Sequence, residues 1–253
     1  MVRHRSDVFS GVGLHEAKAR IRRSACGSFQ RSAIHYPLAA MNGKFITIEG
    51  GEGVGKSTQI SALRDLLVSR GMAVVVTREP GGTPRAERIR ELLLETSEEA
   101  MPPLCELLLM FAGRSTHIEN VIRPALQRGI WVICDRFTDA TYAYQGGGRG
   151  MNLDQIESLE RWVQQDLRPD LTLLLDAPVE IGAQRAAVRN EQRGIIDRFE
   201  HEQKDFFERV RAAYLRRAAA EPQRFAVIDA SVDRDVVTAS IRTAVEPLLS
   251  TVQ

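Results

Sequence analysis

The residues best suited to chemistry form the stretch Gly50-Gly51-Glu52-Gly53-Val54-Gly55-Lys56-Ser57. It fits the phosphate-loop pattern of glycine, four residues, and then Gly-Lys-Ser or Gly-Lys-Thr. Glycines let backbone N–H groups close around an anion, and a helix N-terminus adds favourable partial charge. In such a loop the lysine reaches the outer phosphates and the serine hydroxyl ligates Mg²⁺. The alternative is a glycine-rich turn without a chemical role.

The flanking residues favour the phosphate loop. Residues 45–48 are apolar and partly β-branched, as in a buried strand. After the loop, apolar residues recur at helical spacing up to Arg70, and Gly71 supplies a stop signal. Strand, glycine-rich turn and helix are the arrangement that phosphate binding requires.

Two further segments follow predicted strands, and in parallel α/β sheets ligands gather at the carboxyl ends of the strands. The run at 77–83 turns sharply and leaves Arg78 at a strand end, where its guanidinium can bind phosphate. The pair Asp135-Arg136 offers a carboxylate for the Mg²⁺ shell and an arginine for an acceptor phosphate. An ordinary turn with a solvated charge pair is the alternative for the first run.

Two more segments suggest a base site and a close backbone approach. Phe111 and Arg114 are three residues apart, hence on one helix face, where a ring can stack on a nucleobase and a guanidinium can bind its carbonyl. In isolation they fit a core phenylalanine and a surface arginine. Three consecutive glycines at 146–148 are costly to order. They indicate a backbone that passes close to something or moves, or else a floppy connection.

A basic segment predicts a lid. Arg185, Arg189 and Arg193 recur in steps of four, and arginines so placed on a helix repel one another unless an anion lies between them. Polar residues and a glycine follow, so we predict a mobile, arginine-rich lid at about 185–199. A solvated basic face is the alternative.

From residue 41 onward, strand-like and helix-like segments alternate, which predicts one α/β domain with a five-stranded, mostly parallel sheet and helices on both faces. The predicted strands are 45–49, 73–77, 130–134, 171–176 and 225–228. The predicted helices are 57–70, 84–95, 103–127, 153–166, 179–190, 200–219 and 233–249.

Residues 1–40 show no sustained period, so we predict an extension that is disordered or dispensable, with the folded domain at 41–253. An over-assigned upstream start explains the extension; an arginine-rich, acid-poor targeting segment is the alternative. The extension is basic, whereas the remainder carries 27 basic and 31 acidic residues. The domain is therefore no general nucleic-acid binder.

Composition narrows the class of protein further. Hydrophobic residues make up 43% and charged residues 26% of the 253, which suits a single folded domain. No apolar run approaches the ~20 residues that span a bilayer. The three scattered cysteines form no metal-ligand or redox pair and fit a reducing cytoplasm.

Taken together, these segments resemble the bacterial thymidylate kinase family. The resemblance rests on the loop at 50–57, the run TREPGGT at 77–83, the pair Asp135-Arg136 and the run AYQGGGRG at 143–150, in this order and spacing. The runs TREPGGT and AYQGGGRG are close to family-specific. The resemblance implies a P-loop kinase fold with a mobile arginine-rich lid.

The resemblance also implies the donor site. The loop, Lys56 and Thr58 would hold ATP, and Ser57 and Asp135 would hold Mg²⁺ as the cofactor. The loop interior lacks the arginine that one branch of the family places there. Arg189 or Arg193 of the lid would therefore join Lys56 and Arg136 as catalytic residues. The ATP-binding residues so implied are Gly50, Gly51, Glu52, Gly53, Val54, Gly55, Lys56, Ser57 and Thr58.

For the acceptor, the resemblance implies a dTMP site whose members come from several segments. Its arginines would bind the phosphate and a thymine carbonyl, and Tyr144 would crowd the C2′ edge of the sugar. The family's stacking phenylalanine sits four residues before the arginine, where this chain has Met110, so Met110 and Phe111 both remain open for that contact. The implied residues are Glu52, Arg78, Phe111, Arg114, Arg136, Thr141, Tyr144 and Gln145.

The predicted function is ATP-dependent phosphorylation of dTMP to dTDP by direct in-line transfer, a step of dTTP biosynthesis. The predicted partners are ATP, dTMP and a second copy of the chain, with helix 103–127 as a candidate interface. No membrane partner is expected, and the predicted compartment is the cytoplasm. The alternatives are a kinase for dUMP, UMP or dCMP, and a P-loop protein that binds nucleotide without transferring phosphate.

Overall fold

The computed structural model describes residues 43–193 and 202–250, with side chains described at all of these except 189–193. These residues belong to one compact unit, Leu38–Gln253. The predicted extension at 1–40 and residues 194–199 of the predicted lid lie outside the described residues.

The core of this unit is a five-stranded parallel sheet in the order β2-β3-β1-β4-β5. This confirms the predicted sheet, and the strand ends differ from the predicted ones by one residue at most. The strands are β1 (Phe45–Gly50), β2 (Val74–Arg78), β3 (Trp131–Asp135), β4 (Leu171–Asp176) and β5 (Phe225–Asp229).

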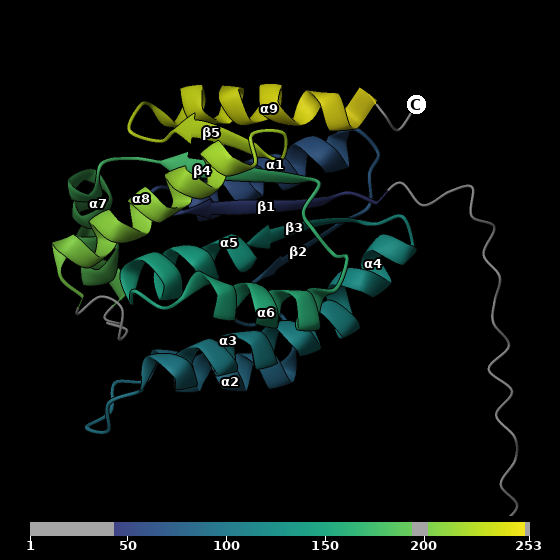
Figure 1. Cartoon of the computed structure of the whole chain (residues 1–253). Helices are drawn as coiled ribbons and strands as arrows, with labels where there is room; N and C mark the ends of the chain where they lie inside the picture. The colour runs from purple at the N-terminus through teal and green to yellow at the C-terminus, as the bar shows by residue number, and fades with distance from the viewer. Residues whose placement is uncertain (1–42, 194–201, 251–253) are drawn as a thin grey trace, which may run out of the picture. The chain divides into compact units, whose positions relative to one another are not determined.

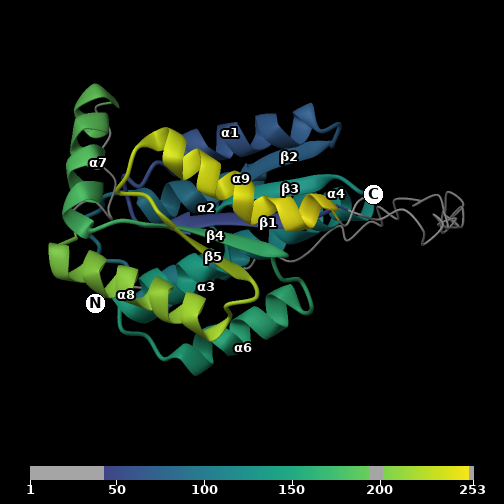
Figure 2. The same cartoon turned by 90° about the horizontal axis from the view of Figure 1, so that it is seen from above.

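Helices cover both faces of the sheet. Figures 1 and 2 show α1 and α9 on one face, with α3, α5, α6 and α8 on the other and α2 packed outside α3. The long helices are α1 (Lys56–Ser69), α2 (Pro84–Leu94), α3 (Pro103–His117), α6 (Leu153–Gln164), α7 (Val179–Arg193), α8 (Lys204–Ala220) and α9 (Arg234–Ser250). The short helical segments are η1 (Ile118–Ile122), α4 (Arg123–Gln127), α5 (Thr138–Thr141) and η2 (Tyr142–Gly148).

Strand β1 is buried on both faces, as a central parallel strand must be. Because side chains alternate along a strand, Ile46 and Ile48 join the apolar cluster under α1 and α9. Thr47 and Glu49 belong to the other face. Glu49 accepts a hydrogen bond from Tyr214 of α8 there, so this face carries buried polar groups beside the edge where β1 ends.

Two helical regions differ from the prediction. The predicted helix 103–127 contains a π-helical turn, η1, between α3 and α4. The glycines at 146–148 form no floppy connection, because they lie in η2 against α8. A Cβ at Gly147 would lie 2.5 Å from Cβ of Ala213, and one at Gly148 would lie 2.5 Å from the ring of Phe206. Gly147 and Gly148 are therefore explained by close packing of η2 on α8, and Gly146 by its approach to Leu153 and Ile156 of α6.

The remaining predicted helices have the right type, with ends that differ by up to four residues. Within 43–193 and 202–250, no helix is both long and apolar enough to cross a membrane.

Candidate active site

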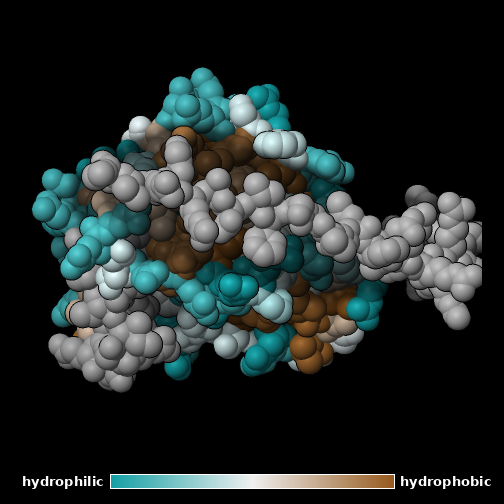
Figure 3. All heavy atoms as spheres, turned by 90° about the horizontal axis from the view of Figure 1, so that it is seen from below, coloured by the Kyte–Doolittle hydropathy of each residue, from teal (hydrophilic) through white to brown (hydrophobic). Residues whose placement is uncertain are grey.

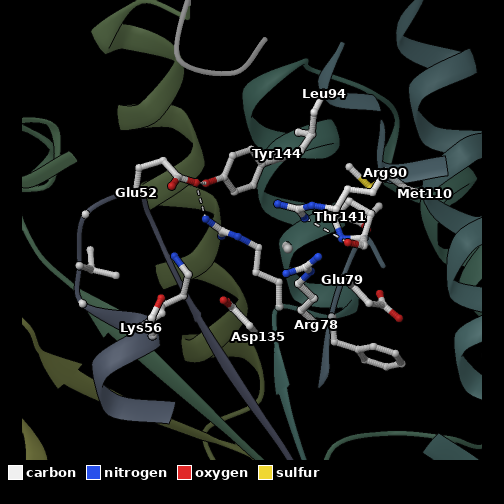
Figure 4. Close-up of a pocket in the computed structure, with 18 of the residues that line it drawn as sticks. Glu52, Lys56, Arg78, Glu79, Arg90, Leu94, Met110, Asp135, Thr141 and Tyr144 are labelled. Atoms are coloured by element: carbon white, nitrogen blue, oxygen red, sulfur yellow. Dashed lines mark hydrogen bonds and ion pairs between the residues drawn. The ribbon is translucent and has the colours of Figure 1, made fainter. Parts of the chain in front are cut away.

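The carboxyl ends of the strands open onto a cavity of about 400 Å³. Strand register aligns Arg78 with Asp135, and Asp135 with Ile48. Figure 4 shows side chains entering this space from the phosphate loop on one side and from β2, α2, α3 and η2 on the other. The lining residues include Glu52, Gly53, Val54, Gly55, Lys56, Ser57, Thr58, Arg78, Glu79, Arg90, Leu94, Met110, Arg114, Asp135, Arg136, Thr141, Tyr144, Gln145 and Arg185.

The loop between β1 and α1 has a backbone that glycine adopts most readily. Gly53 and Gly55 have φ angles of 68° and 88°, in the left-handed region that favours glycine. A Cβ on Gly53 would also lie 2.0 Å from the carbonyl oxygen of Gly182 in α7. The loop therefore passes directly against α7, and its turns leave backbone N–H groups free to form an anion-binding concavity.

Lys56, the first residue of α1, folds back over this loop. Its Nζ donates to the carbonyl oxygens of Gly51 at 2.7 Å and Gly50 at 3.3 Å. Burial and the charge of Arg136 lower the pKa of Lys56 to about 8.

Gly50 and Gly51 themselves line a second cavity of about 550 Å³ between the loop, α7 and α8.

Asp135 presents a buried oxygen to the cavity. Its Oδ1 has no hydrogen-bond partner within the described part of the chain, although buried polar atoms are almost always paired. Ser57, near the start of α1, lines the same cavity and contributes a hydroxyl. Mg²⁺ in phosphoryl-transfer sites is held by one or two oxygen side chains together with substrate phosphates. Ser57 and Asp135 therefore fit a magnesium site.

Arg136 is fixed at the centre of the cavity. Its Nη2 donates to Glu52 at 2.6 Å, and its Nη1 donates to the carbonyl oxygen of Gly50 at 2.7 Å. Its guanidinium lies 4.9 Å from the ring centroid of Tyr144, whose hydroxyl donates to the same Glu52 oxygen at 3.2 Å. These contacts hold Arg136 between the loop and η2.

Arg114 of α3 occupies the far end of the cavity with one donor to spare. Its Nε donates to Glu79 at 2.7 Å and its Nη2 to Thr141 at 2.9 Å. His117 binds the other Glu79 oxygen at 2.9 Å. The Nη1 group of Arg114 is buried and unpaired among the residues that the structure describes. A guanidinium so held can donate to a ligand carbonyl.

Two more arginines lie at the rim beside α2. Arg78, at the end of β2, is half exposed and pairs with Glu87 at 2.8 Å. Arg90 donates to the carbonyl oxygen of Pro80 at 3.0 Å. Both line the cavity, so its rim is positively charged on the side opposite the phosphate loop.

Two predicted residues, Phe111 and Gln145, lie differently from a simple base contact. Phe111 is buried in the core with Ile156, and Met110 is the residue of this turn that lines the cavity. Gln145 lines the cavity, but its Nε2 donates to the buried carboxylate of Glu106 at 2.7 Å. At this turn of α3, Met110 rather than the ring of Phe111 therefore faces the cavity.

The predicted lid is only partly described. Arg185 lines the cavity, and its guanidinium donates to the carbonyl oxygens of Ala230 at 2.7 Å and Ser231 at 3.3 Å. The side chains of Arg189 and Arg193 lie outside the described residues. The structure thus places one of the three predicted lid arginines at the cavity.

Sequence reasoning missed several lining residues, above all Glu79, Arg90 and Leu94. Glu79 stands inside the quoted TREPGGT run, between Arg78 and Pro80, where a carboxylate is easily taken for a solvated charge. Arg90 and Leu94 are four apart on α2, with Glu87 three before Arg90, so helical spacing was the available signal.

Comparison with known proteins gives one consistent answer. The family model described as thymidylate kinase matches residues 48–241. Thymidylate kinase from Pseudomonas entomophila (strain L48) is 58% identical over 209 residues, which cover 83% of this chain and 96% of the relative. Thymidylate kinase from Chromohalobacter salexigens is 62% identical over 201 residues, 79% of this chain and 93% of the relative.

A solved structure is similar as well. The crystal structure of thymidylate kinase from Ehrlichia chaffeensis superposes with a TM-score of 0.63 at 34% sequence identity, and the match covers 79% of this chain and 98% of that one.

Proposed function

The chain belongs to the thymidylate kinase family, and we propose that it transfers the γ-phosphoryl group of ATP to dTMP, yielding ADP and dTDP. The observation that carries this proposal is the cavity itself. At one end it has a glycine-rich loop and a buried carboxylate oxygen, and at the other a buried arginine N–H group, and neither of these two atoms has a hydrogen-bond partner in the described part of the chain. These are the groups that a triphosphate with its cation and a pyrimidine carbonyl would satisfy.

At the donor end, the proposed role of the loop amides and of Lys56 is to hold the β- and γ-phosphates of ATP. Ser57 and Asp135 would hold Mg²⁺, which neutralises charge on the phosphate oxygens during transfer. Lys56 lies beside loop carbonyls, within a short side-chain movement of where those phosphates would bind. The residues proposed to hold ATP are Gly50, Gly51, Glu52, Gly53, Val54, Gly55, Lys56, Ser57 and Thr58.

At the acceptor end, Arg78 and Arg136 are the proposed ligands of the dTMP phosphate. Phosphoryl transfer demands chiefly that donor and acceptor be aligned and that spreading charge be neutralised. Arg136 suits this task because Glu52 and Tyr144 fix its guanidinium next to the phosphate loop. Tyr144 would also lie against the sugar and disfavour a 2′-hydroxyl.

The base would be read at the α3 side of the cavity. Arg114 would donate its unpaired Nη1 to a thymine carbonyl, and Thr141 and Gln145 would lie along the base edge. Met110, rather than Phe111, is the proposed apolar contact with the ring, because it is the one that lines the cavity. Arg189 and Arg193 remain the proposed source of transition-state charge from the lid.

A homodimer is the proposed assembly. Figure 3 shows hydrophobic side chains gathered on the face formed by α2 and α3. Leu92 of α2 and Leu104 and Leu108 of α3 are 52%, 55% and 49% exposed. Exposed apolar patches of this kind mark association surfaces, and α3 begins the segment predicted as the interface.

The test is ADP formation by the purified full chain with ATP, Mg²⁺ and a panel of dTMP, dUMP, dCMP and UMP. We expect dTMP to be the preferred acceptor and omission of Mg²⁺ to abolish turnover. Preference for another monophosphate would replace dTMP as the substrate. Nucleotide binding without acceptor-dependent ADP formation would favour a non-catalytic P-loop protein, although none of the relatives described above carries such a name.

A further inference from the structure

Glu49 is a buried carboxyl group next to the phosphate loop that the proposed chemistry does not use. It is the penultimate residue of β1, it is fully buried, and it lines neither cavity. A buried carboxyl is costly unless it is well bonded, so its partners indicate why it is there.

The first partner is the backbone of the turn that carries Arg136. Oε1 of Glu49 accepts from the N–H of Phe137 at 2.7 Å. Arg136 itself has a φ angle of 67°, one of two described non-glycine residues with positive φ. A side chain in the left-handed region is strained and persists only where surrounding contacts enforce it. The bond from Phe137 to Glu49 is such a contact.

The second partner reaches the guanidinium of Arg136. Oε2 of Glu49 accepts from the hydroxyl of Tyr214 in α8 at 2.7 Å. The Tyr214 oxygen in turn accepts from Nη1 of Arg136 at 3.1 Å. Glu49 therefore holds both the backbone that follows Arg136 and, through Tyr214, its guanidinium.

The charges around Glu49 agree with this role. Burial and the nearby charge of Asp139 raise its pKa to about 8, while Arg136, Tyr214 and the N–H of Phe137 act in the opposite direction. A glutamine of the same size keeps an oxygen for Phe137 and can donate to the Tyr214 oxygen. The position therefore depends on hydrogen bonding rather than on a fixed charge.

We propose that Glu49 and Tyr214 are positioning residues for the acceptor phosphate, which act by fixing the direction of the Arg136 guanidinium. The proposal rests on the proposed function, in which Arg136 binds the phosphate of dTMP. Glu49 lines neither cavity, and Tyr214 lines only the second one, beside Gly50 and Gly51. Both are bonded to the Arg136 turn or its guanidinium, so their loss should weaken acceptor binding more than ATP binding.

The first test is Tyr214→Phe, which removes one hydroxyl and keeps the ring. We expect the dissociation constant and the KM for dTMP to rise about fivefold, as for loss of one typical hydrogen bond, with a smaller change in the KM for ATP. Tyr142→Phe is the matched control, because it also removes a buried tyrosine–carboxylate bond, to Glu160. It should lower thermal stability comparably and leave both KM values alone.

Glu49 is tested by a pair of variants. Glu49→Gln should keep the KM for dTMP within about twofold of wild type, and Glu49→Leu should raise it by tenfold or more. If Glu49→Leu fails to fold, Tyr214→Phe and Glu49→Gln still decide the matter. In the Arg136→Ala background, Tyr214→Phe should not weaken dTMP binding further, because its effect passes through Arg136.

The inference is overturned if Tyr214→Phe changes the KM values for ATP and dTMP equally, or changes neither. It is also overturned if Glu49→Gln is as damaging as Glu49→Leu. These outcomes differ from failure of the proposed function, in which wild-type protein itself forms no ADP with dTMP.

Discussion

The two ends of the cavity are built in different ways. The phosphate end comes from one continuous stretch, 50–58, and its proposed ligands are mostly backbone N–H groups set by glycine turns. The acceptor end comes from β2, α2, α3, β3 and η2, and its ligands are side chains. Three of the arginines there are held by carboxylates, in the pairs Arg78–Glu87, Arg114–Glu79 and Arg136–Glu52.

This difference shows what holds the binding groups in a fixed direction at each end of the cavity. A backbone cradle is rigid once its glycines adopt their turns, so it needs few supporting side chains. A guanidinium on a long flexible stem needs partners to fix its direction, and charge-assisted bonds to carboxylates supply them. The acceptor end should therefore be sensitive to carboxylates that never touch the substrate, whereas the phosphate end should not.

The largest effect is expected at Arg136. Arg136→Ala removes a proposed ligand of the dTMP phosphate, and arginines that neutralise a transferring phosphoryl group are worth about 10³–10⁵ in rate. We expect kcat/KM for dTMP to fall by at least ~10³, measured by ADP formation. Arg64→Ala is the control, because Arg64 is exposed and pairs with Asp65. Near-wild-type turnover of Arg136→Ala would contradict the role of Arg136 as a ligand of the dTMP phosphate.

A smaller but informative effect is expected at the carboxylates. Glu79→Gln weakens the support of both Arg114 and His117 at a buried position, and breaking a buried ion pair costs about 3–5 kcal/mol. We expect a clear drop in unfolding free energy and a kcat/KM for dTMP about 10- to 100-fold lower. Glu87→Gln, whose pair with Arg78 is half exposed, should cost less than about 1 kcal/mol. Equal costs would contradict the distinction between buried and rim pairs.

The next effect is expected in the pH dependence of the unfolding free energy, and its source is Glu49. Its folded pKa of about 8 lies above the ordinary value of 4.5, because burial and Asp139 oppose ionisation. Between these values the folded chain keeps a proton that the unfolded chain releases, so the stability contributed by Glu49 falls as pH rises. Wild type should lose roughly 1 kcal/mol per pH unit relative to Glu49→Gln over this window. Urea denaturation of wild type and Glu49→Gln at pH 5.5 and 7.5 measures their unfolding free energies. An equal change with pH in the two proteins would refute the raised pKa of Glu49.

The smallest effect is expected far from both ends. Removal of residues 1–40 should leave kcat and both KM values unchanged, because the cavity-lining residues within the described ranges 43–193 and 202–250 all lie between 52 and 185. Steady-state kinetics of the truncated and full chains provide the measurement. A large loss of activity on truncation would show that the extension takes part in function.

The contrast between the two ends also explains how much could be predicted from the sequence. The parallel sheet and the phosphate loop follow from local pattern, since apolar strand runs and the 50–57 spacing are continuous in the chain. The acceptor end was predicted through its motifs, but its geometry depends on contacts between distant segments. Glu79 and Tyr214 have no local signal, because their roles come from Arg114 and Arg136, which are 35 and 78 residues away.

Helix phase accounts for the remaining difference. Phe111 and Met110 are adjacent in sequence, and only the packing of α3 against Ile156 of α6 decides which one faces the cavity. Gly147 and Gly148 are similar, because they are required by the surface of α8, more than 50 residues further along the chain. Local propensity cannot supply information of this kind.

The most direct test of the account is the ratio of kcat/KM for dTMP to that for dCMP. Thymine presents a carbonyl oxygen where cytosine presents an amino group, so the unpaired donor of Arg114 should favour dTMP. Arg114→Lys keeps a charge for Glu79 but loses the forked donor, and we expect it to lower the ratio by about tenfold. Lys56→Ala should reduce both rates and leave the ratio unchanged. A ratio that is unaffected by Arg114→Lys, or that falls equally with Lys56→Ala, would contradict the assignment of separate tasks to the two ends.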